Sequence, residues 1–152
     1  MPKVEYTESK GLVQKTATSA LPAGTLSGNL RKVITLTDAD SELTAADSGA
    51  IVVCAALTGA RTVTLPATAG AHFEVHVVDT GANLNFEAGT LEIVGTVVDG
   101  GAEVTSADAT KSIFRVADDG APGDRFLLTC DGTRYVVAGA SVKDATKYSF
   151  QT

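Results

Sequence analysis

The sequence predicts an all-β protein: one β-sandwich or jelly-roll-like domain preceded by an extended N-terminal arm. Valine and threonine are prominent and suit pleated, half-buried strands, whereas glycine and aspartate are prominent and suit turns. Short apolar or alternating runs recur about every 8–12 residues with turn residues between them, a spacing typical of sandwiches and barrels. No segment carries the sustained period of a long helix.

The length of the chain and its apolar content are consistent with one domain. A chain of 152 residues with 44% hydrophobic residues can bury a real core but is too short for two ordinary domains. We divide it into an extended arm at residues 1–31, a β-sandwich domain at 32–140 and a polar C-terminal tail at 141–152.

The strands are predicted from apolar runs bounded by turn residues. Residues 51–56 form a continuous apolar run, which predicts a strand buried on both faces. Residues 72–79 alternate, with Phe73, Val75 and Val77 on one face and His72 and His76 on the other. Further strands are expected at 33–37, 62–65, 83–88, 91–94, 96–98, 111–117, 125–130 and 134–138.

Turn and cap residues complete the prediction. Asp131-Gly132 lies between two apolar runs and predicts a hairpin whose primed turn has positive φ at both central residues. Gly95 interrupts a strand pattern and indicates a bulge or tight bend. The segment 44–47 is suited to capping one helical turn. In the tail, Tyr148 and Phe150 mark a final strand or a contact.

The first thirty residues differ from the rest because their apolar residues are isolated and follow no period. Pro22 and two glycines break any regular element there. Such a segment cannot bury enough apolar surface to fold alone, so it is either disordered or an arm ordered by a partner. Scattered apolar anchors favour the arm, and the expected partner contacts are Val4, Tyr6, Leu12, Val13, Leu21 and Leu26. The last two are expected where the arm meets the body.

The charge distribution bounds the partners. A net charge of −6 argues against nucleic-acid binding through a basic patch. Residues 1–32 hold five basic and two acidic residues, a net of +3, which leaves −9 for the remainder. A mildly basic arm before an acidic body suggests that the arm lies on something acidic, such as another copy of the body. We expect no membrane span and see no signal peptide.

The residue types that carry chemistry are sparse. His72 and His76 are the only histidines, and both lie on one predicted strand face, which does not suit a catalytic triad. The stripe formed with Glu74 suits either a metal or, more simply, the solvated face of an amphipathic strand. The acidic runs 38–42 and 118–119 lack the calcium-loop spacing and suit Asx turns. Cys54 and Cys130 are either buried thiols or one disulfide between strands. We expect no enzyme, no metal and no cofactor.

Three stretches in order carry a resemblance. The first is LTAADSG at 43–49, the second is TVTLP at 62–66 followed by HFEV at 72–75, and the third is GDRFLL at 123–128 followed by DGTRY at 131–135. Over about residues 34–140 this succession resembles small β proteins of tailed-phage virions, in particular the capsid decoration (head cement) proteins. In place of a fuller aromatic cluster, the last strand holds a single Tyr135.

The resemblance implies a structural virion protein on the outer surface of the phage head. It implies a β-sandwich homotrimer that binds the major capsid protein, bridges capsomers and is assembled in the host cytoplasm. Many modest contacts at symmetric sites would supply its affinity. The alternatives are a carbohydrate- or receptor-binding β module of a tail fibre or spike, a small enzyme on a β scaffold, and an unrelated bacterial β domain. The scarcity of aromatic residues counts against sugar stacking.

Overall fold

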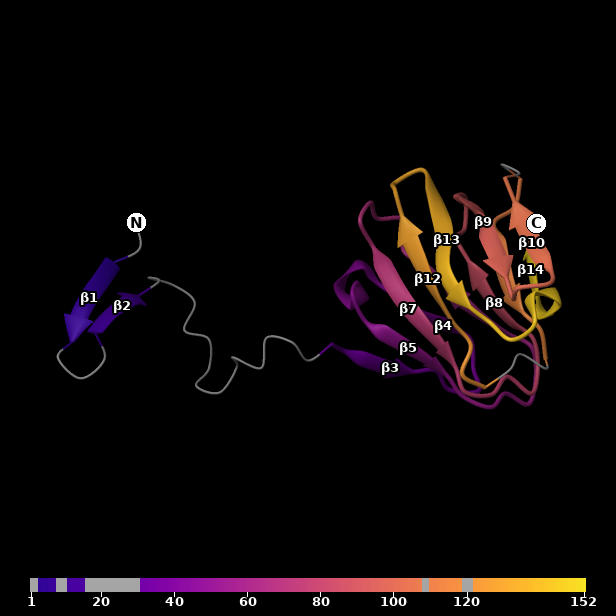
Figure 1. Ribbon diagram of the computed structural model, residues 1–152, viewed down its shortest axis with the longest axis horizontal. Helices are drawn as coiled ribbons and strands as arrows, with labels where there is room; N and C mark the ends of the chain where they lie inside the picture. Colours follow the sequence, from indigo (N-terminus) through magenta and orange to yellow (C-terminus); the bar gives the residue numbers. More distant parts are fainter. Residues whose placement is uncertain (1–2, 8–10, 16–30, 108–109, 119–121) are drawn as a thin grey trace. The chain divides into compact units, whose positions relative to one another are not determined.

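The computed structural model describes residues 3–7, 11–15, 31–107, 110–118 and 122–152, the first two ranges by their backbone only. The chain divides into two compact units, residues 1–30 and 31–152 (Figure 1). In the first unit, strands β1 (Lys3–Thr7) and β2 (Gly11–Lys15) form an antiparallel hairpin. We predicted an extended arm without regular structure, so this hairpin is a feature that the sequence pattern did not reveal.

The second unit, the body, consists of two mixed β-sheets, which confirms the predicted all-β class (Figure 1). In the seven-stranded sheet the strands follow one another in this order: β10 (Glu103–Ser106), β9 (Glu92–Val98), β13 (Arg134–Ser141), β12 (Arg125–Cys130), β7 (His72–Val77), β5 (Ile51–Cys54) and β3 (Val33–Thr35). In the five-stranded sheet the order is β14 (Tyr148–Gln151), β11 (Ile113–Val116), β8 (Leu84–Glu87), β6 (Arg61–Thr64) and β4 (Ser41–Glu42). Two single 3-10 turns, η1 (Ala45–Asp47) and η2 (Ala145–Lys147), complete the described elements.

From β3 to β8 the chain alternates between the two sheets and stacks on itself. Strands β3, β5 and β7 pair in parallel in one sheet, and β4, β6 and β8 pair in parallel in the other. Strands β3 and β4 therefore form one coil of the chain, β5 and β6 the next, and β7 and β8 the third. The three coils lie side by side as in a solenoid. A jelly roll pairs its strands antiparallel, so these parallel pairs identify the body as a sandwich of a different topology.

The second half of the body extends both sheets mainly by antiparallel pairing. Strand β12 pairs with β7 and with β13, while β11 pairs with β8 and with β14. Strand β9 lies parallel to β13 and antiparallel to β10. Gly95 lies in the middle of a continuous β9, where we expected a bulge or bend. It is needed because a Cβ there would lie 2.4 Å from the Val137 carbonyl oxygen.

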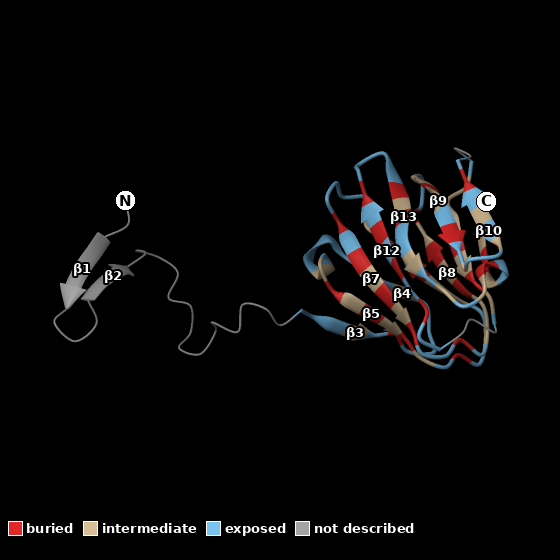
Figure 2. Cartoon of the chain, in the orientation of Figure 1, coloured by how far each residue is buried: buried red, intermediate tan, exposed pale blue. Residues whose placement is uncertain are grey.

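The core lies between the two sheets, and buried and exposed residues alternate along most strands (Figure 2). In β7 the inward residues are Phe73, Val75 and Val77, as predicted. Aromatic rings join the sheets at the centre: the ring of Phe126 lies 5.7 Å from that of Phe86 and 5.0 Å from that of Phe114, both in edge-to-face geometry.

Two predictions, one about the burial of a strand and one about a turn, were wrong. Strand β5 is not buried on both faces: Val52 and Cys54 enter the core, whereas Ile51 and Val53 are half-buried on the outer face of the sheet. In the loop between β12 and β13, only Gly132 has positive φ; no non-glycine residue described here does. The carboxylate of Asp131 instead accepts hydrogen bonds from the backbone N–H groups of Thr133 and Arg134, which closes the turn.

The segment 141–152, which the sequence led us to treat as a polar tail, contributes β14 to the five-stranded sheet. Its Tyr148 is buried, and the hydroxyl donates a 2.7 Å hydrogen bond to the buried carboxylate of Asp124. The body therefore extends to the last strand of the chain, as the prediction of a final strand at Tyr148 and Phe150 allowed.

Two smaller predictions are also resolved. The backbone N–H and the hydroxyl of Thr44 both donate to the Asp47 carboxylate, so residues 44–47 do cap one helical turn. Cys54 and Cys130 are free buried thiols, and burial raises the pKa of Cys54 to about 12. Among the described residues, no helix is long and apolar enough to cross a membrane.

Candidate functional site

The six predicted arm contacts belong to the first unit, and the structure gives backbone positions for four of them. Val4 and Tyr6 lie in β1, and Leu12 and Val13 lie in β2, with Tyr6 directly opposite Leu12 in the register. Leu21 and Leu26 lie outside the described residues. A hairpin of two strands is at best marginally stable alone in water, so this unit is suited to a role in which a partner completes it.

The outer face of the seven-stranded sheet belongs to the larger of the two sheets of the body. Its central strands β7 and β12 present the alternate residues that do not enter the core: His72, Glu74, His76, Arg125, Leu127 and Thr129. The register places His76 opposite Arg125 and Glu74 opposite Leu127. Charged and apolar side chains are therefore interleaved on this face.

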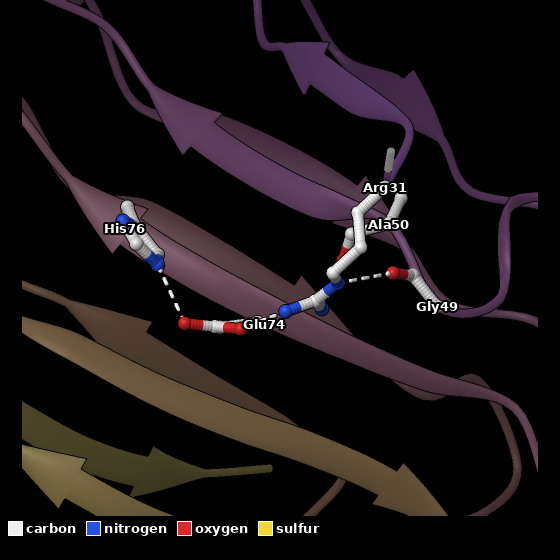
Figure 3. Close-up of polar contacts among 5 residues, drawn as sticks. All are labelled: Arg31, Gly49, Ala50, Glu74 and His76. Carbon is white, nitrogen blue, oxygen red and sulfur yellow. Dashed lines mark hydrogen bonds and ion pairs between the residues drawn. The ribbon is translucent and has the colours of Figure 1, made fainter. Parts of the chain in front are cut away.

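An ion-paired cluster on this face anchors the start of the body (Figure 3). The guanidinium of Arg31 donates a 2.9 Å hydrogen bond to the Gly49 carbonyl oxygen and pairs with the Glu74 carboxylate. The other oxygen of Glu74 lies 2.7 Å from Nε2 of His76. Hydrogen bonds from His76 and Arg31 lower the pKa of Glu74. The carboxylate is thus held in its charged form.

The neighbouring Lys32 adds a second attachment at the same point of the chain. Its ammonium group pairs with the carboxylate of Asp47, and this contact, with those from Thr44, lowers the pKa of Asp47 to about 2. Two consecutive basic residues, the first two of the body, are therefore fixed to β7 and to η1.

The two histidines have separate partners. Nδ1 of His72 lies 3.2 Å from the hydroxyl of Ser48, whereas His76 contacts Glu74. In the part of the chain that the structure describes, no group of three or more His, Cys, Asp or Glu side chains is arranged to hold a metal ion. The stripe predicted from the sequence is present, but its side chains are used in local pairs.

A shallow hollow lies beside the ion-paired cluster. It has a volume of about 200 Å³ and is lined by Glu74, Arg125, Phe126, Leu127 and Gly139. A bulge contributes to its shape: Arg125 pairs with Ser141 but Leu127 pairs with Ala138, so β13 carries one extra residue at this point. The sequence offered no signal for this hollow beyond Gly139, whose φ of +59° suits a bulge.

Comparison with protein-family models gave no match, and no curated protein matched the chain significantly.

Proposed function

We propose that this chain is a capsid decoration (cement) protein of a tailed phage. In this proposal it binds the major capsid protein on the outer surface of the head, bridges capsomers and acts as a homotrimer. It works by adhesion and not by catalysis, without a cofactor, and it contacts neither nucleic acid nor a membrane. It joins the virion in the host cytoplasm.

The division of the chain into two unlike units is the observation on which the proposal rests. The body has its own core of 25 buried residues, whereas the described part of the first unit is one two-stranded hairpin. Because such a hairpin is marginal alone, a partner that binds it would order it on assembly. An arm of this kind adds contact area at each symmetric site, and many such sites give avidity.

The ion pairs on the body are compatible with a role in adhesion. On the outer face of the seven-stranded sheet, Arg31 and His76 both contact Glu74, and Arg134 pairs with Asp131. These contacts stabilise local structure, and Glu74 is the one member of them that lines the adjacent hollow. A broad sheet face of this composition suits contact with another surface.

The test is binding to empty shells. Full-length protein is mixed with expanded, undecorated heads assembled from the major capsid protein of the same phage, and bound copies are counted by cryo-electron microscopy. We expect saturable occupancy of symmetric sites. The full-length variant Tyr6→Ser/Leu12→Ser should lose binding, whereas the control Glu5→Gln in the same hairpin should retain it.

The outcomes separate the proposal from its alternatives. Heads that remain bare at saturating wild-type protein would refute decoration. Equal occupancy by both hairpin variants would remove the first unit from the contact. Bare heads together with binding to host cells would identify the chain as a receptor-binding module of a tail fibre or spike.

A further inference from the structure

We propose that two copies of the body bind each other through an ion pair between Arg125 of one copy and Asp79 of the other, with Val78 and Leu127 as its apolar surround. We call these four residues the Arg125 patch. The inference rests on the homo-oligomer included in the proposed function, and it names the surface that forms it.

Arg125 stands apart from the other arginines. All five arginines of the chain lie in the described part. The side chain of Arg125 is exposed and has no hydrogen bond or ion pair with any described residue, whereas the other four are bonded to Glu74, Asp38, Asn85 and Asp131. A guanidinium fits a carboxylate through two parallel hydrogen bonds. Among the arginines of the described body, Arg125 is therefore the one whose guanidinium can still bind a carboxylate in this way.

Asp79 is the matching acidic group. It is the second residue after β7, is exposed, and its carboxylate has no partner among the residues described. By contrast, Asp47 and Asp131 have a lowered pKa because their side chains accept several hydrogen bonds. Asp79 thus leaves a charged acceptor free for another molecule.

Arg125 and Asp79 lie towards the same end of the seven-stranded sheet. Arg125 is opposite His76 in the β7–β12 ladder, and the backbone of Val77 bonds to that of Asp124 and Gly123. Asp79 comes two residues after Val77, beyond the end of β7 that lies beside Arg125. No ion pair joins them within one copy, and neither has a partner among the described residues, so each can meet its opposite on a neighbour.

Exposed apolar residues flank this pair. Large exposed hydrophobic residues of the described body are Val33 (59%), Val78 (53%), Val98 (48%) and Leu127 (37%), and two of these four belong to the Arg125 patch. The hollow beside Leu127 offers a neighbour's Val78 a place to be buried. Apolar contacts around a charge pair exclude water and strengthen it.

A second copy fits this patch because the patch carries both signs of charge. Residues 31–152 hold 9 basic and 16 acidic residues, a net of −7, so two bodies repel each other on average. Contact is favourable only where a cation of one faces an anion of the other. One surface that supplies both Arg125 and Asp79 meets this condition around a symmetry axis.

Sedimentation equilibrium of the full-length protein tests the contact. Arg125→Glu and Asp79→Arg should each weaken self-association about tenfold or more, because an attractive pair becomes repulsive. The double variant Arg125→Glu/Asp79→Arg should recover the wild-type association constant to within about threefold. Arg134→Glu is the matched control: it makes the same change of charge on the same sheet face and should leave association unchanged.

Each outcome is decisive. A wild-type monomer, single variants that associate normally, a double variant that stays dissociated, or a control as weak as Arg125→Glu would overturn the inference. Thermal melts check that each variant is folded. Because self-association is measured without heads, its failure is distinguishable from failure of the decoration proposal, which is read from head occupancy by the wild-type chain.

Discussion

Replacing Gly95 by alanine should strongly destabilise the body. The residue has φ of +146°, and an added Cβ would lie 2.4 Å from the carbonyl oxygen and 2.9 Å from the Cβ of Val137. The backbone conformation costs about 1–3 kcal/mol for a residue with a side chain. Overpacking against a neighbouring strand costs about 1–3 kcal/mol more.

The expected total loss of about 2–6 kcal/mol is large beside a domain stability of about 5–15 kcal/mol. Equilibrium unfolding in urea, followed by circular dichroism, measures it. The matched control is Gly100→Ala, where φ is +93° but no atom lies within 4 Å of the added Cβ. That variant should show the conformational cost alone. If Gly95→Ala loses no more stability than Gly100→Ala, the close approach of β9 to β13 does not exist as described.

Three further predictions concern the core and the acid stability of the body. Phe126→Ala should lower the free energy of unfolding by about 3–5 kcal/mol, because its ring contacts three other aromatic rings. A loss below about 1 kcal/mol, measured by unfolding in urea, would contradict this packing. Tyr148→Phe should cost about 1–3 kcal/mol, since the buried Asp124 carboxylate loses a donor; an unchanged urea midpoint would refute the bond. The pKa of Asp47 is lowered from 3.8 to about 2, chiefly by Lys32, so its contribution is present above pH 4 and lost as pH falls towards 2. Asp47→Asn should therefore reduce stability at pH 6 and flatten the fall between pH 4 and 2, and an unchanged slope would count against the ion pair.

The strands that could be predicted from the sequence are those with one face in the core. β7 and β12 alternate between buried and more exposed residues along their whole length, and the sequence alternates with them. β4 could not be predicted because it has only two residues, and its polar Ser41-Glu42 sequence has no alternation to detect.

The stacked coils escaped detection for a physical reason. Ile51 pairs with Glu74 and Arg61 with Leu84, the same offset of 23 residues (74 − 51 and 84 − 61). The preceding coil breaks this period, since Val33 pairs with Ile51 at an offset of 18 (51 − 33). Val52 and Val75 are equivalent and identical, but Cys54 is opposite Val77 and Val63 is opposite Phe86, because a coil interior requires apolar volume and not identity.

The candidate surface was harder to predict than the fold because its contacts join residues far apart in sequence. Arg31 and Glu74 are 43 residues apart and meet only because β5 and β7 are neighbours. Whether an arginine is paired is equally a property of the folded sheet. The sequence supplied the residues of the polar stripe on β7, but nothing in it distinguished Arg125 from the four arginines that have partners.

The point at which the first unit joins the body explains how a load on that unit would be carried. The chain enters the body through β3, a three-residue edge strand that pairs only with β5 among the described strands. Such a short edge strand alone would open readily. Arg31, however, is bonded directly to Glu74 on β7, two strands in from β3, and Lys32 is bonded to Asp47. A pull on the first unit therefore acts on the third strand of the seven-stranded sheet as well as on its edge, which is the arrangement needed if the hairpin holds the body to a partner.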